Sequence, residues 1–292
     1  MKILLATDGS EYSEGAAKFL KNLKLSSDDE ITILHVITRL PFKDAWESSY
    51  SSLKEEIASK IFESTIDLLK PVNAKINKAL IYGYPDKVIV DVAEELNTNM
   101  IVLGARGLKG IESVLLGSVA RSVAINSLKP VLVIKSPQWV ASEKLRILFA
   151  TDGSKYAQEA GRFLTVLPFH ENTEVTILHV IHSGLDIPEK FHVEIDKKIK
   201  EIALEFRSFQ IKESEKILEQ ADNLLSSKFK KINKMTKDGD SSIEILSTAK
   251  AFKTDIIAIG SRGLKGIKGM LGSVSRYILS HSECSVLIEK TM

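Results

Sequence analysis

Residues 104–118 begin with GARG and end, after nine intervening residues, with GS. This stretch joins an apolar segment typical of a strand to an amphipathic segment typical of a helix, and it returns at 260–273 as GSRG, eight residues and GS. Glycine lets the backbone approach a ligand closely and adopt a positive φ, and the free N–H groups at a helix start favour phosphate. We call the two stretches the first and second glycine ladders and interpret them as candidate phosphate sites. The alternative is that the glycines only form turns and that Ser118 only caps a helix.

Other parts of the chain repeat as well. LATDGS at 5–10 returns as FATDGS at 149–154, and TILHVI at 32–37 returns at 176–181, both shifted by 144 residues. Gly104 and Gly260 are 156 residues apart, so the second half has 12 more residues between its second strand and its ladder. We place this insertion in 186–228 and expect one long or two shorter amphipathic helices there. Their apolar stripe is expected to pack on the core or the other half, with partner binding as the alternative: Phe191, Ile195, Ile199, Ile202, Phe206 and Phe209.

The composition is that of a soluble globular protein. The chain has 292 residues, enough for about two domains, and 44% of them are hydrophobic. A net charge of +2 gives no reason to expect nucleic acid or a membrane as a partner, and we interpret the basic stretch 228–237 as a solvated surface. The one cysteine, Cys284, excludes an intramolecular disulfide and a cysteine metal cluster. No apolar run approaches 18 residues and a strand begins at Lys2, so we expect a cytoplasmic protein.

Strand-like and helix-like segments alternate in each half, which predicts an α/β fold with a mostly parallel sheet covered by helices on both faces. The expected domains are 1–137 and 144–292, and the short junction 136–144 predicts that they pack together. In the first half, the expected strands are 3–7, 31–37, 74–82, 100–103 and 131–134, apolar on both faces, and the expected helices are about 11–21, 53–69, 86–96 and 118–126.

Unusual residues follow the ends of the strands, where ligands of parallel sheets bind. Asp8 follows the first strand, His35 lies near the end of the second, Gly83 follows the third, and Gly104 begins the ladder. Asp8 either accepts hydrogen bonds from a nucleotide or forms an Asx turn, and we expect His35 to be a hydrogen-bonded sheet residue. No glycine precedes a lysine, so a P-loop is absent. We name no catalytic residue and no metal site.

Taken together, these motifs resemble the universal stress protein family in its tandem two-domain form. The family pattern Gx2Gx9G(S/T) matches the first ladder, and it is accompanied by Asp8, by HV at 35–36 and by GYP at 83–85. The resemblance covers both halves and implies a five-stranded parallel sheet of order 3-2-1-4-5 in each. It also implies that members with the full ladder bind ATP or a related adenine nucleotide.

The resemblance assigns site residues in both halves, with backbone at the alanine and second-strand valine near adenine, the aspartate near adenosine, and the ladder around ribose and phosphates. The first site comprises Ala6, Asp8, Val36, Gly104, Gly107, Gly117, Ser118 and Val119. The second comprises Ala150, Asp152, Val180, Gly260, Gly263, Gly272, Ser273 and Val274.

The second site departs from the pattern in two ways. Its ladder is one residue shorter, and GDS at 239–241 replaces GYP. One residue spans up to ~3.5 Å, enough to misplace a phosphate contact of ~2.9 Å. A shorter turn at 265–271 can absorb the change, so we expect a weaker or altered second site.

The resemblance also concerns partners. Family members pair through their fifth strands, and here 131–134 and 286–288 can pair within one chain as a pseudo-dimer, with a further homodimer possible. The leading hypothesis is a nucleotide-binding sensor or regulatory module in the stress response, which we do not expect to be an enzyme. One alternative is a slow ATPase or phosphotransferase that uses Mg²⁺ and the ladder cations Arg106, Lys109, Arg262 and Lys265. The other is a protein-interaction scaffold that binds no nucleotide.

Overall fold

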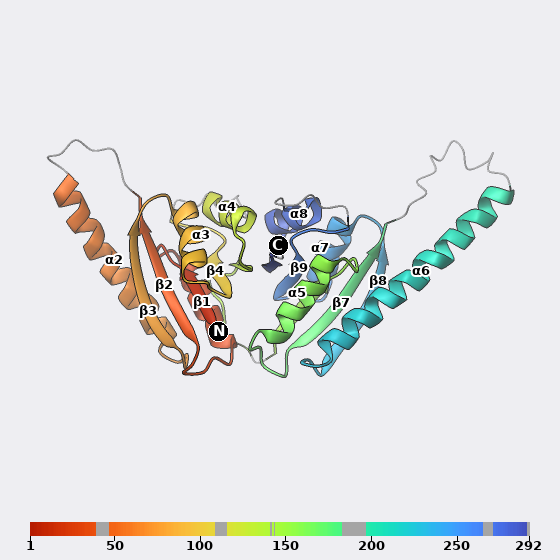
Figure 1. Cartoon of the computed structure of the whole chain (residues 1–292), viewed down its shortest axis with the longest axis horizontal. Coiled ribbons are helices and arrows are strands. Elements are labelled where there is room, and N and C mark those ends of the chain that lie inside the picture. Colours follow the sequence, from red (N-terminus) through yellow and green to blue (C-terminus); the bar gives the residue numbers. More distant parts are fainter. Residues whose placement is uncertain are drawn as a thin grey trace.

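The computed structural model describes residues 1–38, 47–108, 116–140, 142, 144–182, 197–264 and 271–290, with the side chains of 47–50 and 197–200 excepted. Its strands form one ten-stranded sheet in the order β3-β2-β1-β4-β5-β10-β9-β6-β7-β8 (Figure 1). Each half is parallel with the order 3-2-1-4-5, which confirms the predicted fold.

The two halves have matching elements. The first contains β1 (Lys2–Ala6), α1 (Glu11–Phe19), the short 3₁₀ helix η1 (Leu20–Asn22), β2 (Glu30–Ile37), α2 (Glu47–Leu69), β3 (Lys75–Tyr82), α3 (Pro85–Glu95), β4 (Met100–Gly104), α4 (Ser118–Asn126) and β5 (Val131–Ile134). The second contains β6 (Arg146–Ala150), α5 (Lys155–Val166), β7 (Glu174–Ile181), α6 (Lys197–Leu225), β8 (Lys231–Asp238), α7 (Ser241–Ala251), β9 (Ile256–Gly260), α8 (Ser273–His281) and β10 (Ser285–Glu289).

An apolar core lies on each face of the sheet, and both cores continue from one half into the other. One core packs α1, α2, α5 and α6 against the strands, with Phe19 and Phe149 among its fully buried residues. The other packs α3, α4, α7 and α8 against the opposite face. The central strands are buried on both faces, as parallel strands covered by helices must be. The edge strand β3 is only half-buried, so the prediction that it is apolar on both faces is wrong.

The helix boundaries follow capping and apolar periodicity. Ser10 begins α1 by accepting a hydrogen bond from the Ser13 N–H at 3.3 Å. Helix α2 begins at Glu47, six residues before the predicted start. The prediction missed these residues because ESSYSS at 47–52 has no apolar period that indicates a helix. Although α6 has 29 residues, no helix in the described part of the chain is long and apolar enough to cross a membrane.

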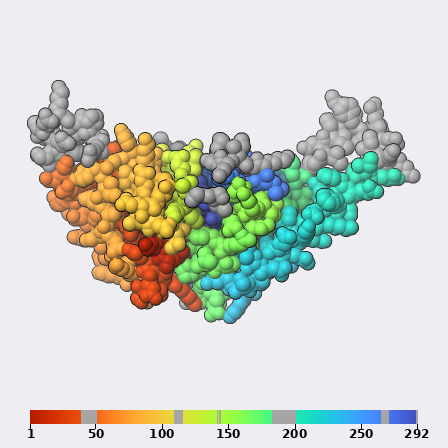
Figure 2. All heavy atoms as spheres, viewed as in Figure 1, coloured from red at the N-terminus to blue at the C-terminus, as the bar shows by residue number. Residues whose placement is uncertain are grey.

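Helix α6 does not bury the predicted apolar stripe. Ile202, Phe206 and Phe209 are 55%, 42% and 59% exposed, so the expectation that the stripe packs on the core is wrong for these three residues. Phe191, Ile195 and the side chain of Ile199 lie outside the described residues. The stripe is displaced around the helix from the line that contacts β8. That line is polar: Arg207 donates to Asp238 at 2.6 Å, and the Ser214 and Thr236 hydroxyls are 2.8 Å apart. A lysine-rich edge strand offers polar partners to the helix, and α6 forms the outer edge of the second half (Figure 2).

The halves join through their fifth strands. β5 and β10 pair antiparallel, with Val133 opposite Val286 and Leu132 opposite Leu287, as predicted. The described part of the junction packs on the first half, where the Trp139 indole N–H donates to Asn22 at 2.6 Å and its ring meets Phe19 edge-on. The two repeats therefore share one continuous sheet.

Candidate functional site

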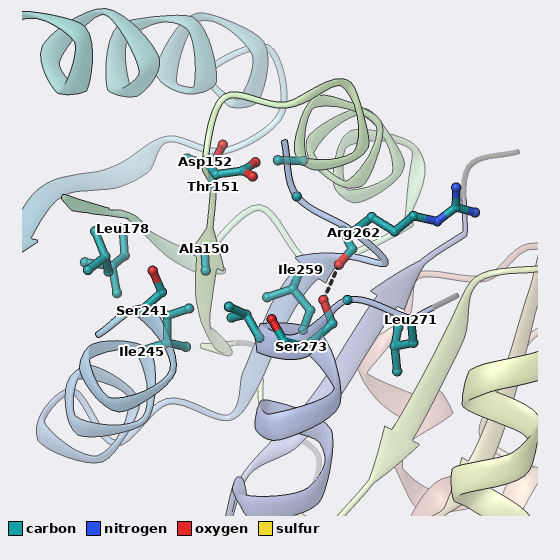
Figure 3. Close-up of a pocket in the computed structure, with 17 residues that line it drawn as sticks. Ala150, Thr151, Asp152, Leu178, Ser241, Ile245, Ile259, Arg262, Leu271 and Ser273 are labelled. Carbon is teal, nitrogen blue, oxygen red and sulfur yellow. Dashed lines mark hydrogen bonds between the residues drawn. The ribbon is translucent and has the colours of Figure 1, made fainter. Parts of the chain in front are cut away.

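A cavity of about 380 Å³ opens in the second half where β6, β7 and β9 end and α8 begins (Figure 3). All eight residues predicted for the second site line this cavity: Ala150, Asp152, Val180, Gly260, Gly263, Gly272, Ser273 and Val274. Residues that are more than 120 positions apart in the sequence are thus brought together, because parallel strands end at the same edge of the sheet.

The sequence interpretation missed part of the lining. Leu178, Ile245 and Ile259 form an apolar wall, and Ser241 and Ser275 add hydroxyl groups. Ser275 donates to the Gly260 carbonyl at 2.8 Å and so ties the first turn of α8 to the end of β9. The period of α7 places Ile245 on its buried face, a signal that was available in the sequence.

The two aspartates organise the loops around the site. One Asp8 oxygen accepts from the Ser10 N–H at 3.1 Å, and the other accepts from the Leu108 N–H in the ladder, also at 3.1 Å. Asp152 does the same with Ser154 and Leu264, at 3.0 and 2.9 Å. The Asx-turn interpretation is therefore correct. An ionised carboxylate has about four acceptor positions, so each aspartate keeps the capacity to bind a ligand as well.

The glycines of each ladder allow close packing rather than a special backbone conformation. A Cβ at Gly104 would lie 2.5 Å from the Tyr12 backbone, and one at Gly260 would lie 2.8 Å from the Tyr156 backbone. Among the described residues, the positive-φ glycines are Gly9, Gly153 and Gly239. The expectation that ladder glycines use positive φ is therefore wrong for Gly104 and Gly107.

The shorter second ladder closes in the same way as the first. The Gly117 N–H donates to the Ala105 carbonyl at 2.7 Å, and the Gly272 N–H donates to the Ser261 carbonyl at 2.8 Å. The missing residue therefore does not displace the start of α8. The second departure from the pattern is also compensated. Helix α3 begins at a proline, whereas its counterpart α7 is capped by Asp240, whose carboxylate accepts from the Ser242 and Ile243 N–H groups.

Each ladder ends at the start of a helix that has no capping side chain. Gly117 and Gly272 are the N-cap residues of α4 and α8, and neither provides a side-chain hydrogen bond. Ser118 and Ser273 are exposed there, followed by half-buried Val119 and Val274. The free N–H groups and the positive end of the helix dipole make each start suitable for an anion.

The sequence pattern of the universal stress protein family matches residues 1–135 and 145–290. The chain belongs to this family. Two universal stress proteins of Methanocaldococcus jannaschii are similar to one half of it: MJ0531 is 35% identical over 47% of this chain and 83% of its own length, and MJ0577 is 31% identical over 46% and 94%. The crystal structure of a universal stress protein from Archaeoglobus fulgidus matches 99% of this chain and 96% of its own, with a TM-score of 0.65 and 23% identity, and so shares the fold.

The arginines of this universal stress protein's ladders lie against tyrosine rings. The Arg106 guanidinium lies over the Tyr12 ring at 5.0 Å, and that of Arg262 lies over the Tyr156 ring at 4.9 Å. Figure 3 shows the Arg262 side chain extending away from Asp152. Lys109 and Lys265, the other two predicted cations, lie outside the described residues.

The two strand histidines have structural partners. His35 Nδ1 is 2.8 Å from the Thr7 carbonyl oxygen, and His179 Nδ1 is 2.8 Å from that of Thr151. The prediction of a hydrogen-bonded sheet histidine is therefore confirmed. Each histidine links the second strand of its half to the residue just before the site aspartate.

Proposed function

We propose that the chain binds an adenine nucleotide, most readily ATP, at each glycine ladder and acts as a sensor or regulatory module in the stress response. The observation that carries the proposal is the cavity of the second half, which runs from an apolar wall to the uncapped start of α8. An adenine ring needs an apolar wall, and a phosphate chain needs an uncapped helix start. The volume lies within the range of about 300–1,000 Å³ that is usual for ligand pockets.

The positions of the residues around the cavity support the following roles. Backbone at Ala150 and Val180 contacts the base, beside Leu178 and Ile245. Asp152 accepts a hydrogen bond from a ribose hydroxyl. The ladder from Gly260 to Val274 surrounds the phosphates, with α8 directed at them by its N-terminus.

We propose that the second site binds as well as the first, in spite of its shorter ladder. The support is the shared closing hydrogen bond of the two ladders and the shared bonds of Asp8 and Asp152. Ser275 adds a contact that Ala120 cannot make in the first half. The expected ratio is therefore two nucleotides per chain.

The pairing of β5 with β10 supports a pseudo-dimer within one chain. Because both fifth strands are used in this way, a homodimer of whole chains requires a different surface. Light scattering of the purified chain distinguishes a monomer from such a dimer.

Isothermal titration of the purified chain with ATP, with and without Mg²⁺, tests the proposal. Saturable binding of two ATP molecules per chain is expected. Absence of heat at millimolar ATP, in both buffers, would contradict nucleotide binding and favour the scaffold alternative. Release of phosphate during the titration would favour the ATPase alternative.

A further inference from the structure

Lys135 crosses from the first half into the second. It follows β5 directly and is only 8% exposed. Its Nζ donates to the Leu279 carbonyl at 2.8 Å and to the Ser282 carbonyl at 2.9 Å. These carbonyls belong to the last turn and the C-cap of α8, so a lysine of one half holds the end of a helix of the other.

Lys290 makes the reciprocal contact. It follows β10 directly and is partly buried, and its Nζ donates to the Ile125 carbonyl at 3.0 Å. Ile125 lies in the last turn of α4. Each lysine therefore contacts a helix of the other half across the junction, where Figure 1 shows α4 and α8 next to each other.

The helices that receive these lysines are the ones that begin at the ladders. Helix α4 begins after Gly117 and α8 after Gly272, and each has nine residues, or about 13 Å of length. A cation at the C-terminal end neutralises the negative pole of the helix, and an anion at the N-terminal end complements the positive pole. A lysine at one end and a phosphate at the other thus stabilise the same helix in the same orientation.

Each lysine is also joined to the ladder of its own half. The Ala105 N–H donates to the carbonyl of Ile134, the residue before Lys135, at 2.8 Å. The Ser261 N–H donates to the carbonyl of Glu289, the residue before Lys290, at 2.9 Å. The backbone therefore connects one ladder, through a lysine, with the helix of the opposite ladder.

We propose that Lys135 is a positioning residue of the second nucleotide site and Lys290 a positioning residue of the first, so that each half orients the phosphate-binding helix of the other. This inference rests on the proposed function of the two ladders. It means that each site depends on the pairing of the halves.

The charges around the lysines predict a pH dependence. Burial is the main cause that lowers the pKa of both lysines to about 8, with Arg106 lowering that of Lys135 further and Arg262 that of Lys290. Cys284 raises the pKa of Lys135 and Glu289 raises that of Lys290, so both act in the opposite direction to the arginines. A neutral amine still donates hydrogen bonds but no longer complements the helix. ATP affinity at each site should therefore fall about two- to fivefold as the pH rises through 8.

A crossed set of variants tests the inference in the full chain. Ser118→Asp leaves only the second site for ATP, and Ser273→Asp leaves only the first, because a carboxylate then occupies the anion position. Lys135→Met and Lys290→Met are introduced into each background, and ATP binding is measured by calorimetry from pH 7 to pH 9. Each methionine variant is the chemically matched control for the other.

Lys135→Met should weaken ATP about tenfold in the Ser118→Asp background and remove most of the pH dependence there, while Lys290→Met should leave that site unchanged. The Ser273→Asp background should show the reverse. Three results would overturn this inference but not the proposed function: equal effects of both lysine variants on ATP affinity at one site, an effect of each variant on the site of its own half, or no effect of either variant. Absence of ATP binding by the unmodified chain would overturn the proposed function and this inference together.

Hydrogen exchange without ATP gives a second readout that does not depend on nucleotide. Lys135→Met should accelerate amide exchange in α8 and Lys290→Met in α4, each without change in the other helix. Unchanged exchange in both helices would overturn the positioning role.

Discussion

Gly107 lies so close to Asp8 that a Cβ at this glycine would stand 2.4 Å from Oδ2 of the aspartate. Gly263 and Asp152 repeat the relationship at 2.5 Å. The second glycine of each ladder is therefore needed by the carboxylate that binds the ladder to the first strand, before any ligand is considered.

Gly107→Ala should destabilise the chain by about 1–2 kcal/mol, because Asp8 must move and lose the Leu108 N–H. Urea denaturation measures this free energy of unfolding. Gly272→Ala is the matched control, since its Cβ would meet its nearest neighbours at an ordinary 3.4 Å and should cost little. Equal costs for both variants would contradict the packing explanation.

Asp152→Asn should weaken ATP binding at the second site and leave the first site unchanged. The amide replaces one acceptor oxygen by a donor, so it cannot accept from both the Ser154 and Leu264 N–H groups. The expected loss is about 1–2 kcal/mol of binding free energy, measured by calorimetry in the Ser118→Asp background. Asp8→Asn in the same background serves as the control and should not change this affinity.

Ser118→Asp should abolish one of two binding events without loss of stability. A carboxylate at the first turn of α4 is favourable to the helix by about 0.3–1 kcal/mol but repels phosphate. The thermal midpoint should stay the same or rise. Ser59→Asp, an exposed position in α2, adds the same charge elsewhere and should retain both events.

The buried lysines should make the chain more stable as the pH rises from 8 toward 10. Their pKa is about 8 in the folded chain and 10.5 ordinarily, so the folded state loses these protons first and the cost of burying the charge disappears in this window. The gain is on the order of 3 kcal/mol for a fully titrated lysine. Denaturation curves at each pH give the free energy of unfolding of the unmodified chain and of the double variant Lys135→Met, Lys290→Met. The difference between the two free energies isolates the contribution of the lysines. A difference that stays constant from pH 7 to pH 10 would contradict it.

The exposed stripe of α6 should tolerate polar substitution. Phe209→Ser changes a side chain that is 59% exposed, so the free energy of unfolding should move by no more than about 0.5 kcal/mol. Leu218→Ala on the same helix removes a buried side chain and should cost about 2–5 kcal/mol. A large cost for Phe209→Ser would mean that the stripe is covered in solution.

The strand–helix alternation was enough to predict an α/β fold with a parallel sheet, whereas the sheet order and the pairing of β5 with β10 came from the resemblance to the universal stress protein family. The place of the site could be predicted from the strands that end at one edge, but its individual lining residues were assigned by the resemblance. Other features depend on distant partners that leave no local pattern. Gly104 is small because the Tyr12 backbone lies against it, and the partners of Lys135 are backbone carbonyls of the other half. The apolar stripe of α6 has helical spacing, which predicted its burial. It is exposed because the helix contacts β8 through polar residues, and the sequence of the helix does not reveal this.

Native mass spectrometry of the intact chain in ATP tests the central claim most directly, because it counts nucleotides per molecule. The account predicts two ATP molecules on the unmodified chain, one on Ser118→Asp, one on Ser273→Asp and none on the double variant. A chain that carries no ATP, or that carries two in either single variant, would contradict binding at the ladders.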